Sequence, residues 1–243
     1  MSLPLIIAHR GSNEHYPEHS LAAYRQAVAE GADGLECDVR LSRDGHLVLH
    51  HDRTVRRTTG SRGVVSDMTL EELRQLNFAA KRPERADEPE SSRIATFEEF
   101  LDLVEETNPN LKLLIETKHP TRFGMRVEEE VYKALSRRPH LDAVVMSFSR
   151  AALRHWRKED KDTPLVWLFE YPFRKPPADI NAFGPRLELV QADHSFLNLA
   201  KDSGQEVFIW TVNTPEAARE VQVADILVTD KPGMIKASLQ ATK

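Results

Sequence analysis

Residues 34–41 read GLECDVRL, a run that alternates like a β-strand and yet carries two carboxylates among apolar residues. Side chains two positions apart in a strand point to the same face, so Glu36 and Asp38 share one face and Cys37 lies on the other. If the carboxylates face the lumen of a closed barrel, Cys37 packs outward against helices as a small apolar residue. The run therefore predicts a barrel strand whose inner face carries chemistry.

Strand-like and helix-like runs alternate on both sides of this segment. Strand periodicity covers residues 5–8, 34–41, 112–117, 143–147, 165–169, 187–192, 206–212 and 226–229. Helical periodicity covers residues 20–30, 96–106, 126–137, 150–158, 197–202, 215–221 and 232–239. Start signals support two of these helices, namely Thr96 with Glu99 as a capping box and Thr214 before Pro215. Eight rounds in 243 residues predict an α/β protein with a (β/α)8 TIM barrel, because a doubly wound open sheet usually needs fewer.

One region interrupts the alternation after the second strand. The pair Asp44-Gly45 is typical of a hairpin turn, and the chain then passes through His51-Asp52 into a polar stretch. Residues 81–93 in this stretch are predicted to form a charged loop. We interpret residues 53–95 as a small insertion on the barrel rim and residues 1–243 as a single domain.

Composition and charge exclude several classes of protein. Hydrophobic residues make up 40% of the chain and charged residues 29%, which predicts a globular protein with a sizeable core. The net charge of -5 and the lack of a basic block give no reason to expect a nucleic-acid partner. No apolar run is long enough for a membrane span or a secretion signal. Because Cys37 is the only cysteine and cannot form an intramolecular disulfide, we expect a cytoplasmic protein.

Charged residues gather where the predicted strands end, which is where barrel enzymes place their active sites. They are His9 and Arg10 after the first strand, Glu36 and Asp38 in the second, His51 after the hairpin, and Glu116 and Lys118 on the third. Strand alternation puts Glu116 on the same face as Lys118, next to the second strand. Three carboxylates are therefore expected to converge.

A divalent cation is the first explanation for such a cluster, because buried carboxylates repel one another unless a positive charge compensates them. Ligation by oxygen alone suits Mg2+ or Ca2+ better than zinc. Neutralising Glu36 or Asp38 should then relieve repulsion in the metal-free protein. The alternative is that salt bridges hold the carboxylates, with Arg10, Arg40 and Lys118 as the partners.

A series of short motifs runs through the chain from about residue 5 to residue 235. The motifs are His9-Arg10-Gly11, Pro17-Glu18, Gly34-Leu35-Glu36-Cys37-Asp38, His51-Asp52, Arg57-Thr58-Thr59-Gly60, Glu116-Thr117-Lys118, Trp210-Thr211-Val212-Asn213 and Thr229-Asp230-Lys231-Pro232. In kind and order they resemble those of the glycerophosphodiester phosphodiesterase family. Two positions depart from the family pattern, since His19 stands where asparagine is usual and Thr117 where leucine is common.

The resemblance implies a barrel that hydrolyses glycerophosphodiesters to sn-glycerol 3-phosphate and an alcohol. It implies that His9 and His51 are the catalytic acid/base pair. It implies one divalent cation, Mg2+ or Ca2+ with Mn2+ as a further candidate, held by Glu36, Asp38 and Glu116. The implied substrate-binding residues are Arg10 and Lys118 near the phosphate, Glu18 lining the site and Trp210 bordering the substrate.

Other interpretations stay open from the sequence. A lysophospholipase D or sphingomyelinase D-like phosphodiesterase would use the same residues on the same barrel, and a noncatalytic barrel that binds phosphoesters is less favoured. An amidohydrolase would show a His-x-His pair on its first strand, which this chain lacks. The attacking oxygen is either water or the glycerol C2 hydroxyl. We expect a small-molecule substrate and a monomer or homodimer, and Asp193-His194 is a further candidate for the pocket edge.

Overall fold

The computed structural model describes residues 3–172 and 180–241, and in them eight parallel strands close into a barrel. In barrel order the strands are β1 (Leu5–His9), β2 (Gly34–Leu41), β4 (Lys112–Thr117), β5 (Asp142–Ser147), β6 (Leu165–Phe169), β7 (Ala182–Pro185), β8 (Glu206–Ile209) and β9 (Ile226–Thr229). The ring is closed because β1 pairs in parallel with both β2 and β9. A further strand, β3 (Leu47–Leu49), pairs antiparallel with the carboxyl end of β2 and stays outside the ring. The prediction of a (β/α)8 barrel is confirmed.

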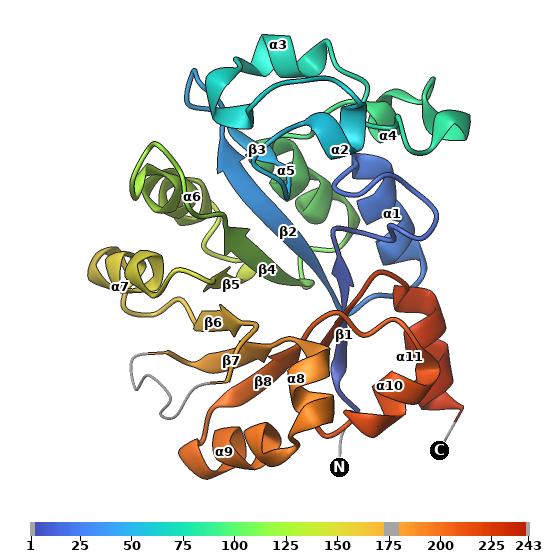
Figure 1. Cartoon of the computed structure of the whole chain (residues 1–243), viewed down its shortest axis with the longest axis vertical. Helices are drawn as coiled ribbons and strands as arrows, with labels where there is room; N and C mark the ends of the chain where they lie inside the picture. Colours follow the sequence, from blue (N-terminus) through green and yellow to red (C-terminus); the bar gives the residue numbers. More distant parts are fainter. Residues whose placement is uncertain (1–2, 173–179, 242–243) are drawn as a thin grey trace.

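Helices surround the strands, as Figure 1 shows. They are α1 (Leu21–Ala29), α5 (Phe97–Thr107), α6 (Arg126–Ser136), α7 (Arg150–Glu159), α8 (Leu187–Ala192), α9 (Ser195–Ser203), α10 (Pro215–Glu220) and α11 (Pro232–Gln240). Both predicted start signals are confirmed: Thr96 and Glu99 form a reciprocal capping box on α5, and the Thr214 side chain caps α10. Among the described residues, no helix combines the length and apolarity needed to span a membrane.

The sixth predicted strand is wrong. Residues 187–192 form the helix α8, in which Leu187 and Val190 are buried at the three-residue spacing of a helix face. Asp193 and His194, a further candidate for the pocket edge, follow this helix and are exposed. Neither residue lines the cavity at the strand ends.

The barrel strand at this place in the alternation is β7. Its sequence, Ala-Phe-Gly-Pro, gives no strand signal, because glycine and proline normally interrupt strands. Gly184 has a packing reason, since a Cβ there would lie 2.4 Å from Cδ2 of Leu168 on the neighbouring strand. The next strand, β8, ends at Ile209, three residues earlier than predicted.

Strand alternation separates two apolar cores. The barrel interior is filled by ten buried residues: Ile7, Leu114, Val144, Met146, Val166, Leu168, Ala182, Phe208, Ile226 and Val228. A larger core lies between the strands and the helices, and it contains Cys37, so the predicted outward orientation of this cysteine is confirmed. The interior core supports the strand ends from below, where charged residues begin.

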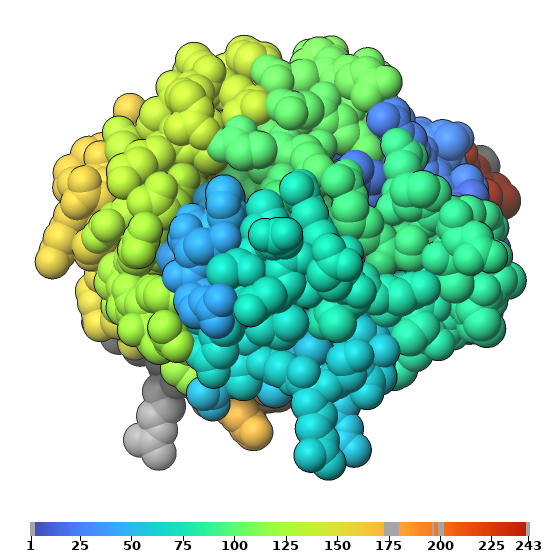
Figure 2. Space-filling view, turned by 90° about the horizontal axis from the view of Figure 1, so that it is seen from above, coloured from blue at the N-terminus to red at the C-terminus, as the bar shows by residue number. Residues whose placement is uncertain are grey.

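The segment between β3 and α5 folds into short helices that lie beyond the end of the β2–β3 hairpin (Figure 1). They are α2 (Arg56–Thr59), η1 (Val65–Asp67), α3 (Leu70–Arg74), η2 (Pro83–Arg85) and α4 (Pro89–Ser92). Its own small core consists of Val48, Val55, Val65, Leu73, Phe78 and Ile94. Figure 2 shows this segment, cyan to green, spread over one face of the molecule. The predicted loop over residues 81–93 is wrong in part, because η2 and α4 lie within it.

Candidate active site

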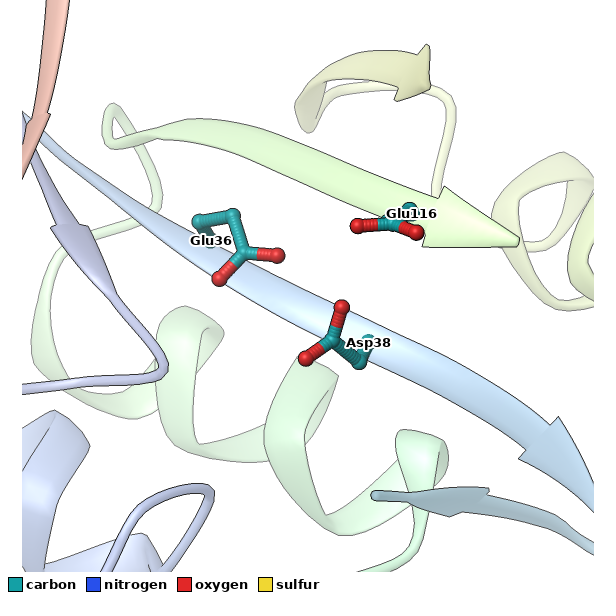
Figure 3. A group of neighbouring side chains, drawn as sticks. All are labelled: Glu36, Asp38 and Glu116. Carbon is teal, nitrogen blue, oxygen red and sulfur yellow. The ribbon is translucent and has the colours of Figure 1, made fainter. Parts of the chain in front are cut away.

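Three carboxylates converge at the carboxyl ends of β2 and β4. The register pairs Asp38 with Glu116 across the two strands, and Glu36 lies one pleat earlier on the same face as Asp38. All three are buried, and one carboxylate oxygen from each lies within 4.8 Å of the others. Figure 3 shows the three carboxylate groups turned toward one another.

Two cations lie directly against this cluster. Arg10 places Nε 3.0 Å from Oδ2 of Asp38, and its backbone N–H donates to Oε2 of Glu36. Lys118 places Nζ 2.8 Å from Asp38 Oδ1 and 2.6 Å from Glu116 Oε1. The salt-bridge alternative is thus realised for two of its three cations. Three carboxylates still face only two positive charges.

The charge imbalance appears in the carboxyl pKa values. Burial, reinforced by the charge of Asp38, raises the pKa of Glu36 well above its usual value. Burial likewise raises the pKa of Glu116 to about 7, although Lys118 opposes the shift. For Asp38 burial also acts upward, but Lys118 and Arg10 outweigh it and hold the pKa well below its usual value. The cluster therefore lacks positive charge when fully ionised, and a divalent cation with a preference for oxygen ligands fits it.

The path of the β1–α1 loop brings Arg10 to this cluster. Arg10 adopts a positive φ of 59°, and Gly11 follows with a φ of 85°. A Cβ on Gly11 would lie 2.7 Å from the backbone of Ala23 in α1, so only glycine lets the loop pass this closely. The glycine of the His-Arg-Gly motif thus has a steric reason.

His9 ends β1 beside the cluster and is bound to a carboxylate. Its Nδ1 lies 2.6 Å from Oδ1 of Asp230, which follows β9. Asn13 and Asn213 donate their side-chain N–H groups to Asp230 and fix its orientation. Burial, with the nearby charge of Arg10, lowers the pKa of His9, so the ring is neutral near pH 7. Since Asp230 binds Nδ1, Nε2 is the nitrogen left for a substrate.

His51, which lies just after β3 of the β2–β3 hairpin, is also bound to a carboxylate. Its Nδ1 lies 2.7 Å from Oδ1 of Asp52, and Arg57 Nε donates to the other oxygen of that carboxylate. Burial lowers the pKa of His51 to about 4. The structure therefore brings two histidines to one site, each oriented by a carboxylate. The sequence interpretation did not assign roles to Asp230, Asp52 or Arg57, although all three lie in the quoted motifs.

Glu18 links the two sides of the site. Its Oε1 accepts hydrogen bonds from Arg57 at 2.6 Å and from Arg10 at 3.3 Å. It lines a neighbouring cavity with Arg57, Tyr16 and Phe78 and does not line the cavity that contains the carboxylates. The geometry places Glu18 where it can position Arg10.

The cavity over the cluster has a volume of about 310 Å³ and two unlike walls. The charged or polar wall consists of His9, Arg10, Glu36, Arg40, His51, Glu116, Lys118, His119 and Glu170. The apolar wall consists of Met146, Phe148, Leu168, Phe208, Trp210 and Val228. Trp210 is fixed by a hydrogen bond from Nε1 to the carbonyl oxygen of Gly184, and its ring meets that of Phe148 edge to face. Such a cavity can take an anionic ester with an apolar side.

His19, one of the two departures from the family pattern, lies against the carboxylate cluster. It is buried, with Nε2 2.8 Å from Oδ2 of Asp38 and Nδ1 2.8 Å from Oη of Tyr24. Burial lowers its pKa, so a neutral ring donates from Nε2 to Asp38. The other departure, Thr117, is buried on the opposite face of β4 from Glu116.

Comparison with known proteins agrees with this geometry. A sequence model of the glycerophosphoryl diester phosphodiesterase family matches residues 9–234. The probable glycerophosphodiester phosphodiesterase 1 of Mycobacterium tuberculosis is 38% identical over 257 residues, which cover 98% of this chain and 93% of that protein. The glycerophosphodiester phosphodiesterase of Caldanaerobacter subterraneus is 32% identical over 238 residues, which cover 94% of each chain. An Oleispira antarctica phosphodiesterase, solved with the product sn-glycerol-3-phosphate, superposes with a TM-score of 0.86 at 25% identity over 98% of this chain and 97% of that chain.

A closed barrel with this arrangement at its strand ends belongs to the class of phosphoric diester hydrolases. The match extends over nearly the whole chain, and relatives above 30% identity cover almost all of it. The chain is therefore a member of the glycerophosphoryl diester phosphodiesterase family.

Proposed function

We propose that this protein hydrolyses glycerophosphodiesters to sn-glycerol 3-phosphate and an alcohol, with a divalent cation at Glu36, Asp38 and Glu116 and with His9 and His51 as the acid/base pair. One observation carries the proposal: two carboxylate-bound histidines line one cavity together with Glu36 and Glu116, and Asp38 completes the cation-deficient cluster beneath its wall. The relatives' names and the bound product of the Oleispira antarctica enzyme support the choice of substrate.

Charge neutralisation is the first requirement of this reaction, because a phosphodiester anion gains negative charge as it becomes pentacoordinate. A bound cation supplies part of this neutralisation as a Lewis acid. Arg10 and Lys118 supply the protein's part, since both lie at the cavity wall and both are already positioned by Asp38. Holding these charges in place before the substrate arrives lowers the cost of reaching the transition state.

Two proton transfers are the second requirement. One histidine takes a proton from the attacking oxygen, either water or the glycerol C2 hydroxyl. The other must first bind a proton at Nε2, which the negative charge of the bound phosphodiester favours, and then gives that proton to the departing alkoxide. Asp230 and Asp52 bind Nδ1 of His9 and His51, which leaves Nε2 of each ring for these transfers. Each carboxylate also stabilises the imidazolium when its histidine carries the proton.

The apolar wall fixes the orientation in which the ester substrate binds. Phe148 and Trp210 stand opposite the charged wall, and Nζ of Lys118 lies 6.0 Å from the ring centre of Phe148. Glycerol carbons pack against the rings while the phosphate oxygens face the cations. Trp210 therefore orients the ester and excludes water from one side of it.

The test is release of glycerol 3-phosphate from a panel of glycerophosphodiesters and lysophospholipids after exhaustive dialysis against EDTA. We expect no activity in the dialysed protein and recovery on adding Mg2+, Mn2+ or Ca2+. Without the cation, the negative charges of the three carboxylates and of the phosphate repel one another. Glu36→Gln should raise the metal concentration needed for half activity, whereas Cys37→Ala, on the outer face of the same strand, should not.

Full activity in EDTA would contradict metal dependence. Hydrolysis of lysophospholipids alone would favour the lysophospholipase D alternative, and binding of diesters without turnover would favour a noncatalytic barrel.

A further inference from the structure

A second cavity opens beside the first one, between the ends of β2 and β4 and the 3-10 helix η1. Its volume is about 230 Å³. Its charged lining consists of Arg40, Arg53, Lys118 and Arg122. Arg40 and Lys118 line both cavities, so the two spaces share a wall.

Four cationic side chains line this second cavity, and one of them, Lys118, is paired with Asp38 and Glu116. Ten residues of the described part of the chain line it, and none of these is an aspartate or glutamate, although the chain as a whole carries a net charge of -5. Arg122 pairs with Asp67, but both side chains are more than half exposed, so solvent weakens that pair. For Arg53, no salt bridge or side-chain hydrogen bond is seen within the described ranges 3–172 and 180–241.

Arg40 is the informative member of this set. Its guanidinium is half-buried and donates from Nε and Nη2 to the same acceptor, the carbonyl oxygen of His51. These bonds hold the His51 backbone, but their acceptor is a neutral carbonyl oxygen, and among the described residues no carboxylate is bonded to this guanidinium. A bound anion would supply the missing partner.

We propose that the second cavity binds an anionic group, a phosphate or a carboxylate, on the alcohol part of the diester substrate. The inference rests on the proposed function. With the diester phosphate at Arg10 and Lys118, the alcohol side can extend past Arg40 into this cavity, where guanidinium groups hold its anion. The protein then prefers diesters whose alcohol carries a second negative charge over those with neutral or cationic alcohols.

The experiment compares kcat/KM for matched substrates: glycerophosphoglycerol, the same compound with a terminal phosphate, the diester of glycerol phosphate with glyceric acid, and glycerophosphocholine. We expect the terminal phosphate to raise kcat/KM about tenfold or more, and the advantage to shrink as salt is added. Preference for the phosphate over the glycerate carboxylate, or the reverse, identifies which anion fits.

Variants assign the effect to the cavity. Arg53→Gln and Arg122→Gln should each lower the ratio of anionic to neutral kcat/KM by several-fold, and Arg53→Glu should shift preference toward glycerophosphocholine. Arg219→Gln is the matched control, because Arg219 is an exposed arginine on α10, between β8 and β9.

Equal kcat/KM for the anionic and neutral diesters, or an unchanged ratio in the Arg53 and Arg122 variants, would overturn this inference and leave the proposed function intact. No hydrolysis of any diester would remove both.

Discussion

His9 and His51 differ in exposure although their hydrogen bonding is alike. The side chain of His9 is 16% exposed and that of His51 is 37% exposed. His51 is thus the more open to solvent. Nothing in the resting geometry makes one of them the base, so substrate chemistry has to separate their roles.

Alanine at either histidine should reduce kcat by about 100-fold or more, because each proton transfer is part of the same reaction. On a diester with a nitrophenol leaving group, which needs little protonation, the variant lacking the general acid should recover much of its rate. The variant lacking the base should not recover. Measuring kcat for both variants on both substrates assigns the roles.

Equal losses on both substrates in both variants would show that the histidines only bind the phosphate. Asp193→Asn, at an exposed carboxylate away from the cavity, is a suitable control.

The strand β2 carries two carboxylates that the structure treats differently. From the sequence, neutralising either should relieve repulsion. In the structure burial and the charge of Asp38 raise the pKa of Glu36, so relief of repulsion is still expected at this residue. No such relief is expected at Asp38, because Arg10, Lys118 and His19 all bind its carboxylate.

Two isosteric substitutions should therefore have opposite effects on the metal-free protein. Glu36→Gln should leave the free energy of unfolding unchanged or raise it, because a disfavoured buried charge is removed. Asp38→Asn should lower it by about 3 kcal/mol, because it leaves buried cations without their partner. Urea unfolding in EDTA measures both, and similar losses in the two variants would contradict the distinction.

Local patterns predicted most elements because each pattern acts over a few neighbouring residues. The strand over residues 112–117 and the capping box at Thr96 follow from alternation and capping chemistry alone. The strand β7 could not be found in this way, because Gly184 is explained only by Leu168 on the adjacent strand. The pattern of residues 187–192 predicts a strand where the structure has α8, because six residues are too few to establish a helical period.

The same limit applies to the site. The carboxylate cluster could be predicted, because strand parity and strand adjacency are enough to bring Glu36, Asp38 and Glu116 together. The contact of His19 with Asp38 could not be, since it depends on how a loop with a positive φ at His19 returns to the barrel. The pairing of His9 with Asp230 joins the two ends of the chain and needs the ring to close.

His50, the residue that follows β3, is buried where the segment between β3 and α5 packs against the barrel. Its Nε2 lies 3.2 Å from the carbonyl oxygen of Thr54, and its ring meets Phe78 edge to face. Burial lowers the pKa of His50 to about 4. Because the folded pKa is below the unfolded value of about 6.5, the unfolded chain binds more protons between these values, and stability falls as pH falls through this range.

His50→Gln should remove this part of the acid sensitivity of the whole fold. Between pH 7.5 and pH 5.0 the parent should lose about 2 kcal/mol more unfolding free energy than the variant, which follows from the shift in pKa. Urea unfolding at the two pH values, with EDTA present to exclude metal effects, gives the difference. Parallel losses in parent and variant would show that His50 is not the cause.

The two walls of the cavity come from different halves of the chain. Nearly all the charged groups precede residue 120, whereas every apolar wall residue lies between Met146 and Val228. For protein engineering this separates specificity from catalysis: a library confined to Phe148 and Trp210, the two wall residues outside the buried interior core, would change what the pocket accepts while the charged residues and the core beneath them stay unchanged. In evolution, substitutions in the second half of the chain can likewise change the preferred substrate while the charged residues of the first half keep the reaction.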